Sequence, residues 1–152
     1  MVSRRWSGAV FAALALALTG CPSGGSKQEF VFNNGAEPET LDPHLQTGVP
    51  EGRLGDALFE GLVSLHPKTL EPVPGVAERW DLSDDKTVYT FHLRQNAKWS
   101  DGTPVDANDF FASWKRALTP ATGSQYAYMY YAIRGAEEFN KGQNEDFGTV
   151  GI

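Results

Sequence analysis

The pattern of apolar and polar residues divides the chain into an apolar leader, a polar spacer and a longer body. Residues 9–18 (AVFAALALAL) are continuously apolar, whereas residues 22–28 (PSGGSKQ) are small or polar. From residue 29 the apolar residues recur with periods of two or of three to four, which are typical of strands and amphipathic helices. We therefore expect a mixed fold of helices and strands after residue 28.

Strand patterns dominate the middle of the chain. The clearest run is TVYTFHLR, in which aromatic and aliphatic residues alternate with other strand formers. Segments rich in Asp, Pro and Gly separate this run from its neighbours and indicate turns. Trp80 precedes the run and Trp99 follows it, so we expect a meander with aromatic side chains on one face. The expected strands cover residues 29–34, 62–65, 73–82 and 87–94.

Two amphipathic helices are also expected. Pro50 can occupy the first turn of a helix over about residues 50–60, and Gly61 provides a natural end. Farther along, Asp106 has the position of an N-cap, and another aspartate three residues later completes a capping box. An apolar stripe with helical spacing follows, so we expect a helix over residues 107–118.

The last part of the chain is less regular. Residues 126–131 (YAYMYY) fit a helical or irregular segment, and AEEFNKG predicts a short helix that ends at Gly142.

Residues 1–20 have the pattern of an export signal: a basic start, an apolar stretch and a small-residue end. The ten apolar residues are half of the roughly 20 that a helix needs to cross a membrane, so we do not expect a permanent span. A short buried core helix is the alternative interpretation, but glycine-rich sequence follows at once.

The only cysteine follows this leader directly. Leu18-Thr19-Gly20-Cys21 resembles the bacterial lipobox, which implies that Cys21 becomes the lipidated first residue of the mature protein. Two or three acyl chains hold a protein firmly at a membrane, whereas one chain binds marginally. The alternative is an ordinary secretory cleavage that leaves a free thiol. Residues 21–28 then form a flexible tether, and the folded part is expected to work beside a membrane.

Composition and charge exclude several classes of protein. A chain of 152 residues that is 41% hydrophobic can build one modest globular core. Arg4 and Arg5 precede Cys21 and no acidic residue does, so the remainder has 11 basic and 19 acidic residues. An acidic body argues against nucleic acid as the partner. One cysteine excludes a framework of internal disulfides.

No pattern of residues indicates catalysis or metal binding. His44, His66 and His92 lie in separate segments without paired spacing, so each is interpreted as a surface or packing histidine. The chain has no G-x-S-x-G motif and no phosphate-binding glycine loop. The basic patch Trp114-Lys115-Arg116 is interpreted as a solvated helix edge. We therefore expect no enzymatic activity, no cofactor and no metal.

Six motifs occur in a fixed order along the body of the chain. They are EPETLDPH, DALFEGLV, PGVAERW, YTFHLRQNAKWSDGTPV, ANDFFASWKRAL and the tyrosine-rich stretch after ATGS. From about Phe30 through Gly151 the chain thereby resembles the N-terminal part of the oligopeptide-binding proteins of ABC importers, in the peptide and nickel class (family 5) of extracytoplasmic solute-binding proteins. GVPE at residues 48–51 points to the oligopeptide branch.

The resemblance implies an α/β protein with the class II periplasmic-binding-protein-like fold and an α+β small domain. Members of the family are much longer, with two lobes and a small inserted domain, and the resemblance implies a further strand of that domain at residues 149–152 (TVGI). We therefore expect residues 29–60 to begin lobe I and residues 61–152 to form a truncated small domain, with lobe II missing. Without a second lobe to close on the ligand, residues 21–152 are expected not to bind a tripeptide tightly.

The resemblance also implies capture of an extended peptide between two closing lobes. Thr47, Gly48, Val49 and Tyr126 match ligand-lining positions of the family. The residues themselves leave other roles open. Gly48 can simply turn the chain, Val49 can pack against the following helix, Tyr126 can belong to the core, and peptide binders can carry an acidic residue in place of Thr47.

The implied partners are oligopeptides, the permease subunits of an ABC transporter and a membrane reached through the lipid anchor. We expect a monomer at the periplasmic or extracellular face of the cell envelope, without nucleic acid. The alternative function is a peptide-sensing or chaperone-like lipoprotein that uses the same fold outside transport.

Overall fold

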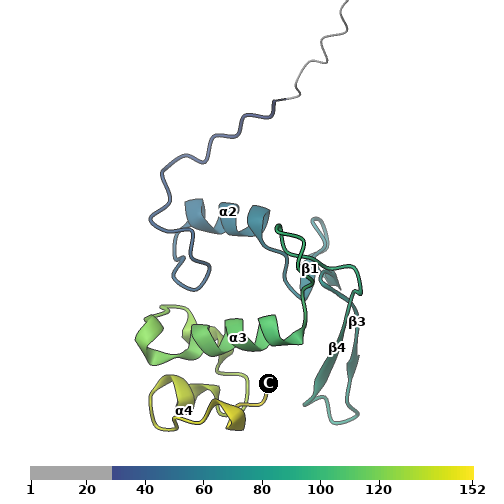
Figure 1. Cartoon of the computed structure of the whole chain (residues 1–152), viewed down its shortest axis with the longest axis vertical. Coiled ribbons are helices and arrows are strands. Elements are labelled where there is room, and N and C mark those ends of the chain that lie inside the picture. The colour runs from purple at the N-terminus through teal and green to yellow at the C-terminus, as the bar shows by residue number, and fades with distance from the viewer. Residues whose placement is uncertain (1–28) are drawn as a thin grey trace, which may run out of the picture. The chain divides into compact units, whose positions relative to one another are not determined.

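A computed structural model describes residues 29–152 of the chain, of which residues 34–152 form one compact unit. Residues 34–152 contain short helices, two β-hairpins and several 3-10 turns (Figure 1). Cys21, the expected signal over residues 1–20 and the expected tether over residues 21–28 lie outside the described residues. Within the described part, no helix combines the length and the apolar character needed to cross a membrane.

The strand expected over residues 29–34 does not form, so this prediction was wrong. The segment is irregular, and the side chains of Phe30 and Val31 are 88% and 82% exposed. A strand is stable only when its backbone hydrogen-bonds to a neighbouring strand, and the described strands pair only with one another. The alternating pattern identifies a segment that can be a strand but not the partner that it requires.

Helix α2 (Val49–Leu58) confirms the helix expected near residues 50–60. Pro50 lies in the first turn, where its missing N–H costs no helical hydrogen bond. The helix ends before Gly61. The N–H of Phe59 makes the last helical hydrogen bond, to the carbonyl of Gly55, and the backbone of Phe59 itself is already extended. The predicted stop at Gly61 was therefore wrong by a few residues.

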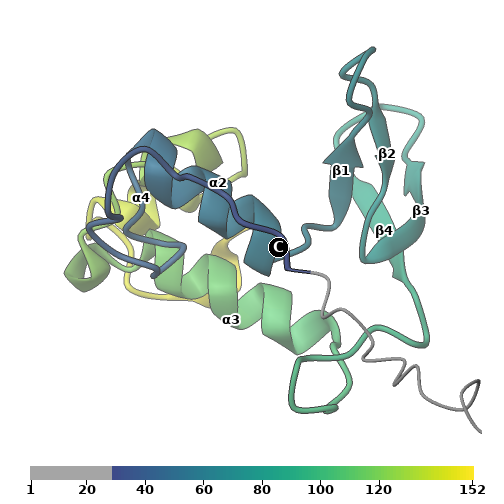
Figure 2. The same cartoon turned by 90° about the horizontal axis from the view of Figure 1, so that it is seen from above.

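Two antiparallel hairpins follow α2 (Figure 2). Trp80 lies opposite Phe91, and Tyr89 stacks on Phe91 with ring centroids 6.2 Å apart, so the expected aromatic face is present along the second hairpin. Trp99 lies outside the hairpin, and its ring N–H donates to Asp109. The paired strands are β1 (Val63–Leu65) with β2 (Pro72–Pro74), and β3 (Ala77–Leu82) with β4 (Tyr89–Leu93).

The two hairpins form separate two-stranded sheets rather than the expected meander. Pro72 and Pro74 have no N–H groups to donate, so β2 cannot pair with a strand on each side. The chain then crosses the residues that precede β1. A Cβ on Gly75 would lie 2.4 Å from the carbonyl oxygen of Gly61, so only glycine fits this crossing.

Helix α3 (Ala107–Leu118) confirms both the expected helix and its cap. Oδ1 of Asp106 accepts from the N–H of Asn108 at 2.7 Å, and the N–H of Asp106 donates to Oδ2 of Asp109 at 2.9 Å. The two carboxylates also lie at the positive end of the helix dipole. Leu118 is completely buried at the other end of the helix.

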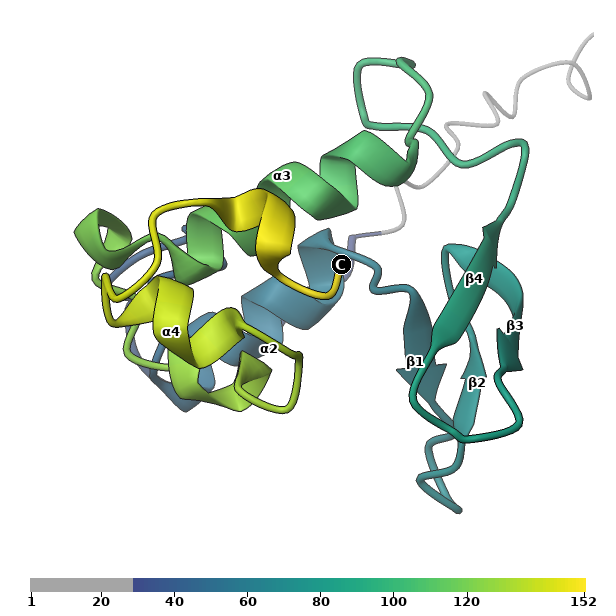
Figure 3. The ribbon, with the colours of Figure 1, turned by 90° about the horizontal axis from the view of Figure 1, so that it is seen from below.

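The main buried cluster lies where α3 ends, and Figure 3 shows α4 and the C-terminal turn beside this helix. The strand expected at residues 149–152 was wrong. Val150 is buried in the cluster, and the N–H of Gly151 donates to the carbonyl of Arg134 at 2.9 Å. The remaining elements are 3-10 helices η1 (Pro120–Thr122), η2 (Ala127–Tyr130) and η3 (Phe147–Thr149), and helix α4 (Ala136–Asn140). The cluster contains Leu118, Ala127, Ala136, Phe139, Phe147 and Val150.

Candidate functional site

Tyr126 lies beside the loop that precedes α2. Its hydroxyl donates to the carbonyl oxygen of Thr47 at 3.1 Å, although 79 positions separate the two residues. Tyr126 is 43% exposed and Val49 is 66% exposed, which argues against a core role for the tyrosine and a packing role for the valine. The structure thus brings all four predicted residues, Thr47, Gly48, Val49 and Tyr126, close together, and their part in ligand binding stays a prediction.

Gly48 is the N-cap of α2, and its backbone is extended, with φ −98° and ψ 164°. Any residue can adopt this conformation, so glycine is not required here for its backbone freedom. A Cβ on Gly48 would lie 2.2 Å from Oε2 of Glu51, so a larger residue here would have to displace the end of that side chain. The carboxylate of Glu51 therefore lies directly against the candidate loop.

Glu51 connects the residues before the loop to α2. Its side chain is only 4% exposed, and Oε1 accepts from the N–H of Glu39 at 2.7 Å. This hydrogen bond lowers the pKa of Glu51 because it favours the ionised carboxylate. The side-chain amide of Asn34 donates to the carbonyl of Pro50 at 3.1 Å and adds a second connection.

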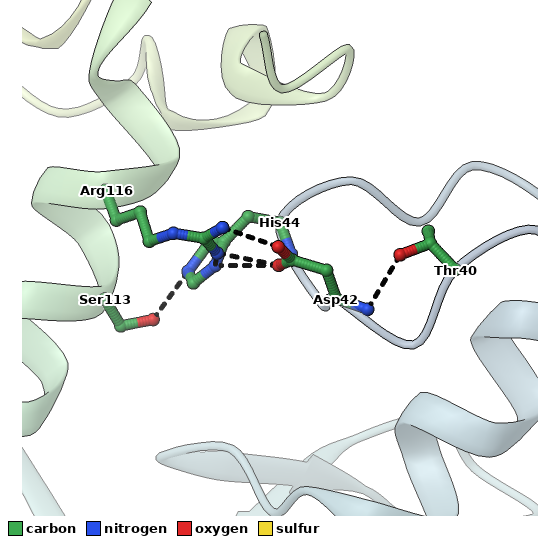
Figure 4. A network of polar contacts seen from close by, with 5 residues as sticks. All are labelled: Thr40, Asp42, His44, Ser113 and Arg116. Atoms are coloured by element: carbon green, nitrogen blue, oxygen red, sulfur yellow. Dashed lines mark hydrogen bonds and ion pairs between the residues drawn. The ribbon is translucent and has the colours of Figure 1, made fainter. Parts of the chain in front are cut away.

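Arg116 of α3 binds the carboxylate of Asp42 through both arms of its guanidinium group (Figure 4). Nη1 donates to Oδ1 at 2.7 Å and Nη2 donates to Oδ2 at 2.5 Å. The guanidinium holds the pKa of Asp42 well below its usual range, and the carboxylate in turn raises the pKa of Arg116. Two parallel charged hydrogen bonds fix orientation as well as distance.

His44 completes this network. Its Nδ1 lies 2.5 Å from Nη1 of Arg116, and its Nε2 lies 3.0 Å from Oγ of Ser113. Because a guanidinium group can only donate, Nδ1 accepts and Nε2 carries the proton that it donates to Ser113. The loop also bonds to itself, since the N–H of Asp42 donates to Oγ1 of Thr40 at 3.0 Å.

The sequence patterns did not single out this network. The interpretation of residues 114–116 as a solvated edge agrees with Lys115 and Arg116, which are exposed, although Arg116 also binds Asp42. It is wrong for Trp114, which is partly buried and lines a cavity. His44 agrees with a packing role, because its side chain is 13% exposed. Asp42 lies in the TLDPH motif, but the arginine that it binds is 74 positions away and leaves no local signal.

A separate cavity of about 1000 Å³ lies between the end of α2, the hairpins and α3. None of the four predicted ligand residues lines it. Glu60 and Arg94 form an ion pair in its wall, with a distance of 2.5 Å from Oε2 to Nη2, and Lys98 and Asp109 add further charged groups. The aromatic residues of this wall are Phe59, Phe91, Trp99, Phe110 and Trp114.

Between residues 29 and 152, no three His, Cys, Asp or Glu side chains gather in an arrangement that could hold a metal ion. The histidines bond to separate partners: His44 to Ser113, His66 to Thr69 and His92 to Asp81.

Comparison with known proteins relates most of the chain to one family. The family model described as bacterial extracellular solute-binding proteins, family 5 middle, matches residues 71–150. The periplasmic oligopeptide-binding protein OppA of Escherichia coli is 50% identical over 130 residues, which cover 83% of this chain and 24% of that protein. The dipeptide-binding protein DppE of Bacillus subtilis is 35% identical over 159 residues, covering 95% and 29%. The chain thus spans about a quarter of the length of the first relatives that it matches.

Solved structures agree with this relationship. The crystal structure of Haemophilus influenzae OppA in complex with RPPGFSPFR matches with a TM-score of 0.68 and 41% identity, over 74% of this chain and 22% of that one. The murein tripeptide-binding protein MppA of Escherichia coli matches with a TM-score of 0.68 and 45% identity, over 71% and 21%. These matches confirm the expected α/β fold as part of a class II periplasmic-binding-protein-like structure. Because the family model covers more than half of its residues, the chain belongs to the family 5 bacterial extracellular solute-binding proteins.

Proposed function

We propose that this chain forms part of an extracytoplasmic solute-binding protein that captures oligopeptides for an ABC importer. Its relatives are named as oligopeptide-binding and dipeptide-binding proteins. The observation that carries the proposal is the hydrogen bond from Tyr126 to Thr47, which gathers the four candidate residues on accessible surface. In this proposal, residues 47–49 and Tyr126 form one wall of the peptide site.

The chemistry of this wall suits a peptide of variable sequence. All peptides offer the same main-chain N–H and C=O groups, so a site that binds the main chain keeps its affinity while side chains enter hydrated pockets. Residues 47 and 48 offer loop backbone, Val49 offers the exposed first residue of α2, and Tyr126 adds an aromatic surface with a hydroxyl group. None of the four positions carries a charge, so this wall discriminates little between charged and neutral peptides.

The proposal extends to the placement of the protein in the cell. Cys21 carries the lipid, the folded part works at the periplasmic or extracellular face of a membrane, and permease subunits receive the peptide. Residues 29–60 begin lobe I, and residues 61–152 belong to the small inserted domain. The protein acts by binding rather than by catalysis, in keeping with relatives that are solute-binding proteins.

A nuclear magnetic resonance titration tests the peptide site. We expect millimolar trialanine to shift the amide signals of Thr47, Gly48 and Val49 and the ring signals of Tyr126, because one wall binds weakly without the rest of the site. Tyr126→Ala should reduce the shifts at the loop. Tyr89→Ala, at an exposed tyrosine of β4, serves as the matched control. Absent shifts, or shifts confined to other residues, would contradict the proposed site.

Labelling with radioactive palmitate in a bacterial host tests the anchor. The wild-type chain is expected to take up label and to sediment with membranes, whereas Cys21→Ser should lose both properties, because the acyl chains require the thiol. Ser23→Ala, two residues away, is expected to behave as wild type. Label retained by the Cys21→Ser variant would overturn the assignment.

A further inference from the structure

Three connections hold the loop that carries the candidate ligand residues. Helix α2 holds its beginning through Glu51, and the Tyr126 hydroxyl bonds to its end at Thr47. In the middle of the loop, two loop side chains bond to two side chains of helix α3, and we name these four residues the α3 clamp (Figure 4). The α3 clamp consists of Asp42, His44, Ser113 and Arg116.

We propose that the α3 clamp sets the position of the ligand-facing loop, so that its members are positioning residues for peptide binding; this inference rests on the proposed function. Asp42 connects α3 to the residues that precede Thr47. While its carboxylate binds Arg116, its carbonyl oxygen accepts from the N–H groups of Leu45 at 3.0 Å and Gln46 at 3.1 Å. Thr47 follows directly, so a shift of Asp42 moves the first candidate ligand residue.

The geometry of the α3 clamp demands these particular side chains. Ser113 and Arg116 lie three positions apart on α3 and therefore share one face of the helix. The guanidinium fork matches both oxygens of Asp42, a geometry that the single ammonium group of lysine cannot reproduce. His44 connects Arg116 to Ser113, because its Nδ1 accepts from Arg116 and its Nε2 donates to Ser113.

The α3 clamp is only partly buried. The side chains of His44 and Asp42 are 13% and 26% exposed, whereas that of Arg116 is 48% exposed. Solvent therefore still screens the ion pair, and we expect its effect on the position of the loop rather than on overall stability. The α3 clamp also joins positions 74 apart, and such a connection can fix a loop that local hydrogen bonds alone leave free to move.

Amide hydrogen exchange on the full 152-residue chain tests the α3 clamp without any ligand. Arg116→Gln removes the fork, and we expect exchange at Leu45 and Gln46 to accelerate about tenfold, as for the loss of one charged hydrogen bond. Arg116→Lys keeps the charge and should give a smaller acceleration. Lys115→Gln removes a neighbouring exposed charge from the same helix and should leave both amides unchanged. Equal exchange at Leu45 in the two glutamine variants would overturn the inference.

Two further readouts separate positioning from general stability. The amide of Leu93 in β4 should exchange equally in all variants. The ¹⁵N signal of His44 Nδ1 should change in Arg116→Gln, because this nitrogen loses the hydrogen bond that it accepts from Arg116, and should stay the same in Lys115→Gln. Equal acceleration at Leu93 and Leu45 would reduce the α3 clamp to a contributor to overall stability and would overturn its positioning role.

Trialanine links the loop to the ligand. Arg116→Gln is expected to need about tenfold more trialanine than Lys115→Gln for the same shift of the Val49 amide. An unchanged requirement would overturn the positioning role. If wild type itself shows no trialanine-dependent shift, the proposed peptide site fails, whereas the exchange of Leu45 still decides whether the α3 clamp fixes the loop.

Discussion

At the scale of single residues, Asp42 connects a helix to a loop by two different groups. Its carboxylate binds Arg116 on α3, and its backbone carbonyl accepts from the two residues that precede Thr47. Only the ionised carboxylate can accept from both arms of the guanidinium group. The contribution of Asp42 to stability therefore depends on pH.

Acid should weaken this connection. The pKa of Asp42 in the folded chain lies well below the value of about 3.9 for an unfolded aspartate. The ion pair therefore contributes stability that is fully present above that unfolded value and is lost as the pH falls through the folded pKa. Between about pH 5 and about pH 3, we expect the thermal midpoint of wild type to fall more than that of Asp42→Asn.

Asp84→Asn provides the control for this pH dependence, because Asp84 is an exposed acid in the turn between β3 and β4. It should follow the wild-type profile. Identical profiles for wild type and Asp42→Asn would show that the ion pair does not link folding to pH.

At the scale of helices and strands, the sequence predicts those elements whose stabilising contacts are local. The cap of α3 lies within one helical turn, and the alternation in β4 lies within five residues, so both can be read from short windows. The segments 29–34 and 149–152 also have strand-forming composition, but a strand needs a partner from elsewhere in the chain. The bond between Asp42 and Arg116 could not be predicted from a short sequence window either, because its partners are 74 positions apart.

The cap of α3 gives the prediction at this scale. Asp106→Ala removes the acceptor for the N–H of Asn108, and we expect a loss of about 1 kcal/mol in the free energy of unfolding. Asp84→Ala, at an exposed acid outside any helix, should change it by less than about 0.5 kcal/mol. Urea unfolding followed by circular dichroism measures both. Equal losses in the two variants would argue against the cap.

At the scale of the whole molecule, the described part of the chain buries few large apolar side chains. Leu118, Phe139 and Phe147 lie in the cluster at the end of α3, whereas many apolar side chains of α2 and the hairpins are exposed. Hydrophobic pattern alone could therefore indicate only a mixed fold. The ordered motifs identified the family, and they also pointed to Thr47 and Tyr126, whose separation of 79 positions hides their contact from any local pattern.

A chimaera tests most directly whether this chain supplies a wall of a peptide site. The matching 130 residues of Escherichia coli OppA are replaced by those of this chain, and trialanine binding is measured by calorimetry. We predict that the chimaera binds trialanine, that Tyr126→Ala within it weakens binding about tenfold, and that Tyr89→Ala has no effect. A folded chimaera that binds no trialanine, or that binds it equally well with Tyr126→Ala, would contradict the account.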